Sequence, residues 1–136
     1  MQHHTSSLSG KVVLITGAAR RIGAVIARRL HHAGMRVIIH YRQSHREASA
    51  LCTYLNDSRE DSATLIAADL SRHDEILRLA EQAQAVWGQV DALINNASSF
   101  FPTPVGTVTT SQWDDLMNSN LRAPFFLTQA LVPSLA

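Results

Sequence analysis

Cysteine and lysine are nearly absent from this chain, and each absence restricts its chemistry. Cys52 is the single cysteine, so an intramolecular disulfide is excluded and a reducing, cytoplasmic location is expected. Lys11 is the single lysine, and the other eleven basic residues are arginines. A mechanism that needs a catalytic lysine must therefore use Lys11 or proceed without one.

Long apolar runs and a strong net charge are also missing. No window approaches the ~20 apolar residues that a membrane span requires, and the N-terminal stretch MQHHTSSLSGK lacks the apolar core of a signal peptide. The net charge of +1 provides no electrostatic reason to expect a nucleic-acid or membrane partner. With 136 residues, 46% of them hydrophobic, the chain is sized for one globular domain. Residues 1–9 are expected to form a flexible tail.

Short apolar runs alternate with longer amphipathic ones, and no repeat or linker interrupts the pattern. Strands are predicted at residues 12–15, 37–41, 64–68 and 92–95, and helices at residues 22–33, 47–55, 76–87 and from Ser111, the expected N-cap of the last helix. This repetition predicts right-handed crossovers and an α/β fold with a doubly wound, parallel, Rossmann-like sheet. The sheet is expected to be incomplete at its C-terminal side, with the fourth strand at an open edge.

A glycine-rich turn, TGAARRIG, follows the first predicted strand. Gly17 supplies the backbone freedom for the turn, and Gly23 lets the next helix pack closely. The helix N-terminus offers free N–H groups and a positive dipole end to an anion, and Arg20 and Arg21 add two cations beside Ile22. An ordinary strand-to-helix turn is the alternative, but the position between a buried strand and an amphipathic helix favours a phosphate site.

The end of the second strand indicates which dinucleotide would bind. An acidic residue there would hold the ribose hydroxyls of NAD, but the strand ends in HYRQS and no acid precedes Glu47. Arg42 and Ser44 offer a guanidinium and a hydroxyl, which suit the 2′-phosphate of NADPH, and Arg20 adds a cation. Solvated surface arginines are the alternative. We expect NADPH as the cofactor, with Tyr41 also in its site.

From Ser9 onward the chain resembles the N-terminal part of a short-chain dehydrogenase/reductase. TGAARRIG is similar to the family's T-G-x-x-x-G-x-G turn, with Arg21 at the second glycine. The resemblance implies a structural and catalytic role for Asn120 in NSNLRAP. It also implies cofactor contacts from the segments AADLS and NNAS, namely from Ala68, Asp69, Leu70, Asn96, Ala97 and Ser98.

Two departures from the family pattern, the arginine in the turn and the segment NNASSFFPTP, are similar to the pteridine reductases. This resemblance implies that Arg21 reaches across the pyrophosphate toward a pterin and that Ser98 bonds both cofactor and substrate. It implies that Phe100 and the nicotinamide sandwich the pterin ring, a stacking contact worth about 0.5–1.5 kcal/mol beyond burial. Pro102 would shape the pocket wall, and Phe101 is expected to pack internally. The expected substrate is a pterin or folate.

The family's catalytic Tyr-x-x-x-Lys pair does not occur in the chain. Tyr41 and Tyr54 are followed four residues later by His45 and Ser58. We therefore expect one dinucleotide-binding domain over residues 1–136 that stops before the catalytic pair and is inactive alone. The seven histidines form no cluster with ligand spacing, so no metal site is predicted.

Three hypotheses about function stay open. The chain is part of an NADPH-dependent pteridine reductase, or of another short-chain reductase acting on a ketone such as a 3-oxoacyl thioester, or it is a catalytically inactive NADPH-binding module. The open fourth strand predicts marginal stability, oligomerisation or aggregation. The resemblance implies a homotetramer for the complete protein.

Overall fold

Strands and helices alternate from residue 12, as the apolar pattern predicts. A computed structural model describes residues 7–99 and 101–135. In chain order the elements are β1 (Val12–Ile15), α1 (Arg21–His32), β2 (Arg36–Tyr41), α2 (His45–Ser58), β3 (Ala63–Ala67), α3 (His73–Val86), β4 (Ala92–Ile94), α4 (Thr110–Met117), the π-helical turn η2 (Asn118–Arg122) and α5 (Ala123–Leu131). Each predicted strand and helix is present, and α2 and α3 begin earlier than expected.

The four strands form one parallel sheet in the order β3-β2-β1-β4. Val13 on β1 lies in register with Val37 on β2 and with Ala92 on β4. This order is that of a doubly wound, Rossmann-like sheet, so the predicted fold class is confirmed. Within the described residues β4 lies at an edge of the sheet, where the sequence placed the open strand.

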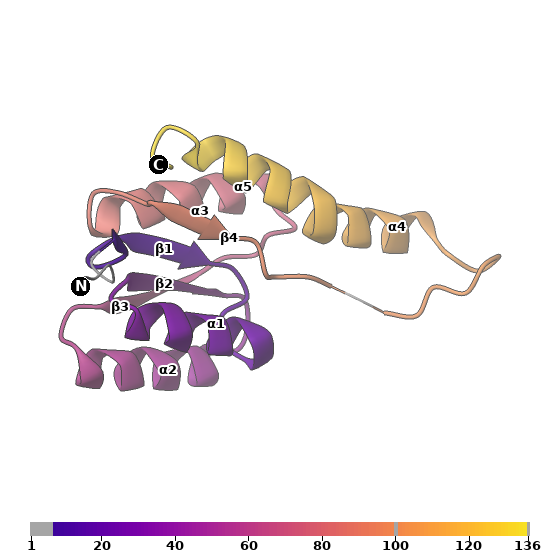
Figure 1. Ribbon diagram of the computed structural model, residues 1–136. Coiled ribbons are helices and arrows are strands. Elements are labelled where there is room, and N and C mark those ends of the chain that lie inside the picture. Colours follow the sequence, from indigo (N-terminus) through magenta and orange to yellow (C-terminus); the bar gives the residue numbers. More distant parts are fainter. Residues whose placement is uncertain (1–6, 100, 136) are drawn as a thin grey trace.

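Side chains alternate between the two faces of the sheet, and helices cover both faces (Figure 1). Val12 and Leu14 point into one apolar core, while Val13 and Ile15 point into the other. The first core is completed by α3 and α5 and the second by α1 and α2. Burying a leucine or isoleucine side chain stabilises a fold by roughly 1.5–3 kcal/mol, so the sheet is a firm platform for the loops at its ends.

The last helical region begins at a capping box. The hydroxyl of Thr109 accepts a hydrogen bond from the Gln112 N–H (3.1 Å), and the Gln112 side chain accepts one from the Thr109 N–H (3.0 Å). The prediction that Ser111 is the N-cap was wrong, because this reciprocal pair satisfies two N–H groups at once and leaves Ser111 inside the helix. No helix in the described part of the chain is long and apolar enough to cross a membrane.

The capping box leads to a test of local stability. We expect Thr109→Ala to lower the free energy of unfolding by about 1 kcal/mol, because the Gln112 N–H loses its acceptor. Ser111→Ala, two positions along the same helix, should change it by less than about 0.5 kcal/mol. Urea denaturation followed by circular dichroism measures both values. A larger cost for the Ser111 variant would contradict the assigned cap.

A π-helical turn joins α4 to α5, and the three segments form one long helical rod (Figure 1). Pro124 at the start of α5 has no N–H to donate to the carbonyl of Asn120, so the α-helical ladder is interrupted at η2. The α4 end of the rod projects beyond the sheet together with loop 101–109.

Candidate functional site

The loops that follow β1, β2, β3 and β4 meet at one edge of the sheet, because the carboxyl ends of parallel strands lie together (Figure 1). These loops and the start of α1 carry most of the residues predicted to bind the cofactor. Those residues are Gly17, Arg20, Arg21, Ile22, Gly23, Tyr41, Arg42, Ser44, Ala68, Asp69, Leu70, Asn96, Ala97 and Ser98.

The turn after β1 is held tightly against the loop after β4. Gly17 has φ 61°, and a Cβ at this position would lie 2.9 Å from the Cα of Ala97. The Gly17 carbonyl accepts a hydrogen bond from the side chain of Asn96 (3.0 Å). Only glycine combines this left-handed conformation with so close an approach, so the turn presents backbone rather than side chain to the site.

Thr16, which directly precedes Gly17, also joins this turn to the loop after β4. Its buried hydroxyl accepts hydrogen bonds from the N–H groups of Asn96 (3.0 Å) and Ala97 (2.9 Å). The turn after β1 and the loop after β4 therefore form one hydrogen-bonded unit. Sequence reasoning did not assign Thr16, although a threonine directly before the first glycine of the turn was a visible indication.

The N-terminus of α1 opens toward solvent beside this unit. Arg20, the N-cap residue, makes no capping hydrogen bond within the described residues, and the first turn of α1 contains no acidic residue. Arg20, Arg21 and Ile22 are exposed, Ile22 by 70%. Arg21 has φ 54°, a left-handed conformation at the position where the family turn has glycine. Free helix N–H groups and two exposed arginines are therefore neighbours at the start of α1, and groups of both kinds attract anions.

The end of β2 brings a third cation to the site. Arg42 is 58% exposed in its side chain and lies 3.6 Å from the Asp69 carboxylate. An exposed ion pair of this kind is worth only ~0–1 kcal/mol, so Arg42 can turn to a phosphate at little cost. Ser44, the N-cap residue of α2, makes no side-chain capping hydrogen bond to any described residue, and the Tyr41 hydroxyl lies 2.7 Å from His45 Nδ1.

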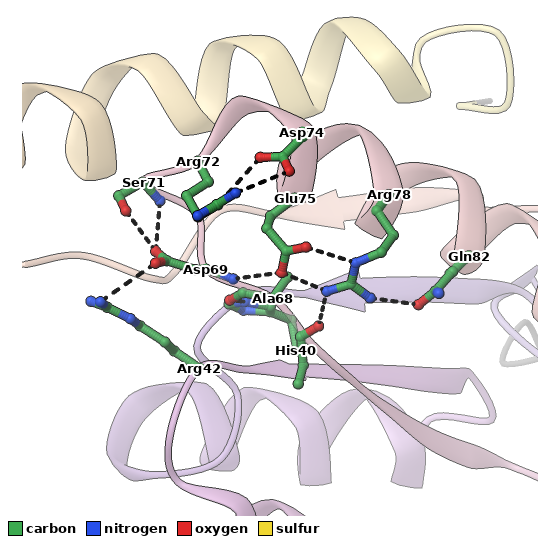
Figure 2. Close-up of polar contacts among 11 residues, drawn as sticks. His40, Arg42, Ala68, Asp69, Ser71, Arg72, Asp74, Glu75, Arg78 and Gln82 are labelled. Atoms are coloured by element: carbon green, nitrogen blue, oxygen red, sulfur yellow. Dashed lines mark hydrogen bonds and ion pairs between the residues drawn. The ribbon is translucent and has the colours of Figure 1, made fainter.

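Asp69 anchors the loop after β3 (Figure 2). Its carboxylate accepts hydrogen bonds from the Ser71 N–H (3.0 Å) and hydroxyl (2.7 Å). Partial burial would raise the pKa of Asp69, but the Ser71 hydrogen bonds and the Arg42 and Arg72 cations lower it below the ordinary value. Asp69 is therefore charged at neutral pH and holds the loop in a fixed shape.

A second ion pair supports this loop from α3 (Figure 2). Arg78 donates to the Glu75 carboxylate (2.7 Å) and to the Ala67 carbonyl (2.6 Å), and Glu75 accepts from the Asp69 N–H (3.4 Å). The Arg78 hydrogen bond lowers the pKa of Glu75 to about 2. Sequence reasoning missed both residues, whose three-residue spacing on a helix favours such a pair.

Of the predicted substrate residues, Ser98 and Pro102 lie on the segment after β4, whereas Arg21 is the first residue of α1. Asn120 in η2 accepts a hydrogen bond from the Ser99 N–H and donates one to the Ser99 carbonyl, both at 2.8 Å. It therefore clamps the backbone directly after Ser98, which is exposed. Pro102 is exposed on loop 101–109, and Phe100 lies outside the described residues. The fold thus brings Asn120 of η2 next to the segment that contains Ser98.

This geometry, a glycine turn and polar loops at the carboxyl edge of a doubly wound sheet, agrees with the sequence comparison. The family model for short chain dehydrogenase matches residues 11–136. The chain belongs to the short-chain dehydrogenase family. The resemblance predicted at the level of the superfamily is thereby confirmed.

Curated members of the short-chain dehydrogenase family are similar over most of the chain. Pteridine reductase 1 of Leishmania tarentolae is 36% identical over 97% of this chain and 56% of its own length. Trihydroxynaphthalene reductase of Colletotrichum orbiculare is 33% identical over 92% of this chain and 44% of its own length. The chain therefore spans about half the length of the curated relatives it matches.

Two solved structures superpose closely on this chain. A blue fluorescent protein from a metagenomic library, in complex with NADPH, has a TM-score of 0.89 and 38% identity, covering 94% of this chain and 52% of that chain. A metagenomic short-chain oxidoreductase in complex with NADP has a TM-score of 0.87 and 38% identity, covering 95% of this chain and 58% of that chain. Both agree with the cofactor predicted from the sequence.

Proposed function

We propose that this chain is the cofactor-binding part of an NADPH-dependent pterin reductase. The observation that carries the proposal is Arg21, an exposed cation placed on the glycine turn by a left-handed backbone conformation. An NADPH site alone needs a tight turn and a helix N-terminus there. An additional cation suits a substrate with a polar, electron-rich edge, as a pterin has. The similarity to a pteridine reductase supports the same substrate class.

The site residues fit NADPH in three places. A Cβ at Gly17 would collide with Ala97 and one at Gly23 with the Gly17 carbonyl, so the two glycines let the turn, α1 and the loop after β4 pack in the tight form that a pyrophosphate site uses. The N-terminus of α1 supplies N–H groups to that pyrophosphate. We assign Arg42 and the Ser44 hydroxyl, which follow β2, to the 2′-phosphate of the adenine ribose, and Asp69 in the loop after β3 to the adenine.

The reduced nicotinamide supplies the hydride for reduction of the substrate. The residues of this chain bind and orient. Asn120 holds the segment after β4 through both backbone groups of Ser99. Ser98 would offer a hydroxyl to cofactor and substrate, Phe100 would sandwich the pterin ring against the nicotinamide, and Pro102 would shape the pocket wall. The family's tyrosine and lysine do not occur at the required spacing in this chain, so no residue of the chain is assigned to proton transfer.

Reduction of a ketone is the second candidate. The similarity to trihydroxynaphthalene reductases favours it, because two of them are 33% and 34% identical to this chain over 92% of its length. A ketone has no extended polar edge that would require Arg21 as a partner. The response of ligand binding to a change at Arg21 therefore separates the two candidates.

Calorimetric titration at saturating NADPH tests the proposal. We expect 7,8-dihydrobiopterin to bind the NADPH-loaded chain, and a 3-oxoacyl thioester to give no heat of binding. Arg21→Gln should weaken pterin binding about tenfold, the loss of one charge-assisted hydrogen bond. Arg29→Gln, an exposed arginine in the last turn of α1, is the matched control and should change nothing. Binding of the thioester without the pterin would favour the ketone reductase.

We also propose that the protein assembles as a homo-oligomer. Trp113, Leu121 and Phe125 are each about 60% exposed along the rod from α4 to α5. A groove of about 550 Å³ lies beside Asn120 and Phe125. Together with the edge position of β4, this apolar surface favours contact with further protein.

A further inference from the structure

His40 is a buried polar residue in an otherwise apolar strand. It follows Val37, Ile38 and Ile39 on β2 and is 2% exposed. Neither the predicted cofactor contacts nor the predicted substrate contacts include it. A buried imidazole is costly unless both ring nitrogens find partners, so its hydrogen bonds indicate what it does.

Both ring nitrogens of His40 bond to backbone groups of other loops. Nδ1 lies 3.0 Å from the Gly17 nitrogen, and Nε2 lies 2.9 Å from the Ala68 oxygen (Figure 2 labels His40 and Ala68). A backbone N–H only donates and a carbonyl only accepts, so His40 is neutral with its proton on Nε2. Burial lowers the pKa of His40, which agrees with a neutral ring.

These two backbone groups belong to different parts of the proposed NADPH site. Gly17 is in the turn that would hold the pyrophosphate, and Ala68 directly precedes Asp69 in the loop that would meet the adenine. The backbone carbonyl of His40 also accepts a hydrogen bond from the Ala18 N–H (3.0 Å). One residue of β2 therefore connects the loops after β1 and β3, and it lies two positions before Arg42.

We propose that His40 is a positioning residue that sets the affinity for NADPH by holding the Gly17 N–H and the Ala68 carbonyl in a fixed relation. The inference rests on the proposed function, because it assigns those loops to the cofactor. Of the two hydrogen bonds, the one to Gly17 contributes more to the affinity for NADPH. Gly17 already has a left-handed conformation and touches Ala97, and its peptide plane keeps one orientation only while its N–H has an acceptor.

Two substitutions separate the two hydrogen bonds of His40. In His40→Asn the side-chain oxygen is as many bonds from the backbone as Nδ1, so it can still accept from Gly17. In His40→Gln the side-chain nitrogen is as many bonds away as Nε2, so it can still donate to Ala68 but leaves Gly17 without its acceptor. We expect the Asn variant to bind NADPH within about threefold of the unaltered chain and the Gln variant to bind at least about tenfold more weakly.

His31 provides the matched control. It is also a buried histidine, 3% exposed, and lies in the last turn of α1, away from the Gly17 turn. Its Nε2 lies 2.6 Å from the hydroxyl of Ser62. His31→Asn and His31→Gln should lower stability without changing the dissociation constant for NADPH. A merely structural role of His40 would make its variants behave in the same way as these.

Two measurements are needed: fluorescence titration with NADPH, and amide hydrogen exchange at Gly17 followed by NMR without cofactor. Exchange at Gly17 should accelerate in His40→Gln and stay near the original rate in His40→Asn. Equal NADPH affinities of the Asn and Gln variants, or unchanged Gly17 exchange in the Gln variant, would overturn the inference. Failure of the unaltered chain to bind NADPH would instead overturn the proposed function, while the exchange rates would still decide the role of His40.

Discussion

Gly23→Ala is expected to abolish measurable NADPH binding and to lower the free energy of unfolding by about 3 kcal/mol. A Cβ at Gly23 would collide with the Gly17 carbonyl oxygen and would lie 2.6 Å from the Asn96 side-chain nitrogen and 2.8 Å from the Ala18 Cα. Two of these neighbours are backbone atoms, and the Asn96 amide is held in place by its hydrogen bond to the Gly17 carbonyl. Helix α1 would have to move away from the turn, and its N–H groups would no longer converge on a phosphate.

Urea denaturation and fluorescence titration with NADPH measure the two effects separately. Val25→Ala is the control, since Val25 lies in the same helix with 55% of its surface exposed and should change stability by less than about 0.5 kcal/mol. A Gly23→Ala protein with unchanged stability and cofactor affinity would show that α1 does not pack against the turn as described.

Arg42→Asp is expected to reverse the preference between NADPH and NADH. Loss of a charge-assisted hydrogen bond to the 2′-phosphate, together with repulsion by the new carboxylate, should weaken NADPH binding by about 3 kcal/mol, or roughly 100-fold. NADH has no phosphate there, and a carboxylate can accept from its ribose hydroxyls, so its affinity should stay level or rise. The new charge would also lie near Asp69, which now pairs with Arg42 at 3.6 Å.

Parallel titrations of NADPH and NADH at fixed ionic strength test this reversal. Arg29→Asp makes the same change in net charge at the opposite end of α1, which separates a local effect from a general electrostatic one. If the Arg42 and Arg29 variants kept the same ratio of NADPH to NADH affinity, Arg42 would have no part in recognition of the phosphate.

The sheet could be predicted from the sequence because its strands are apolar runs in which local pattern and burial agree. Val12 to Ile15 are all fully buried, as such a run requires. The position of the candidate site could then be predicted as well, because the carboxyl ends of parallel strands lie at the same edge of the sheet. The N-cap was a local error, because Thr109 and Gln112 form a capping box that the pattern contained and the prediction overlooked.

The supporting contacts of the site could not be predicted, because they join residues far apart in the chain. Thr16 bonds to Asn96 and Ala97, and His40 bonds to Gly17 and Ala68. Such pairs depend on the register between neighbouring strands, and a strand that is apolar on both faces, such as β1, has no alternating pattern that would specify it. A polar residue inside an apolar strand indicates only that some partner exists.

The left-handed backbone at Arg21 has a consequence for protein engineering. A side chain other than glycine in that conformation costs about 1–2 kcal/mol. A redesign that ranks substitutions by thermostability alone would therefore choose glycine at this position and gain melting temperature. It would also delete the one guanidinium that we assign to substrate choice, so the more heat-resistant enzyme would be the less selective one.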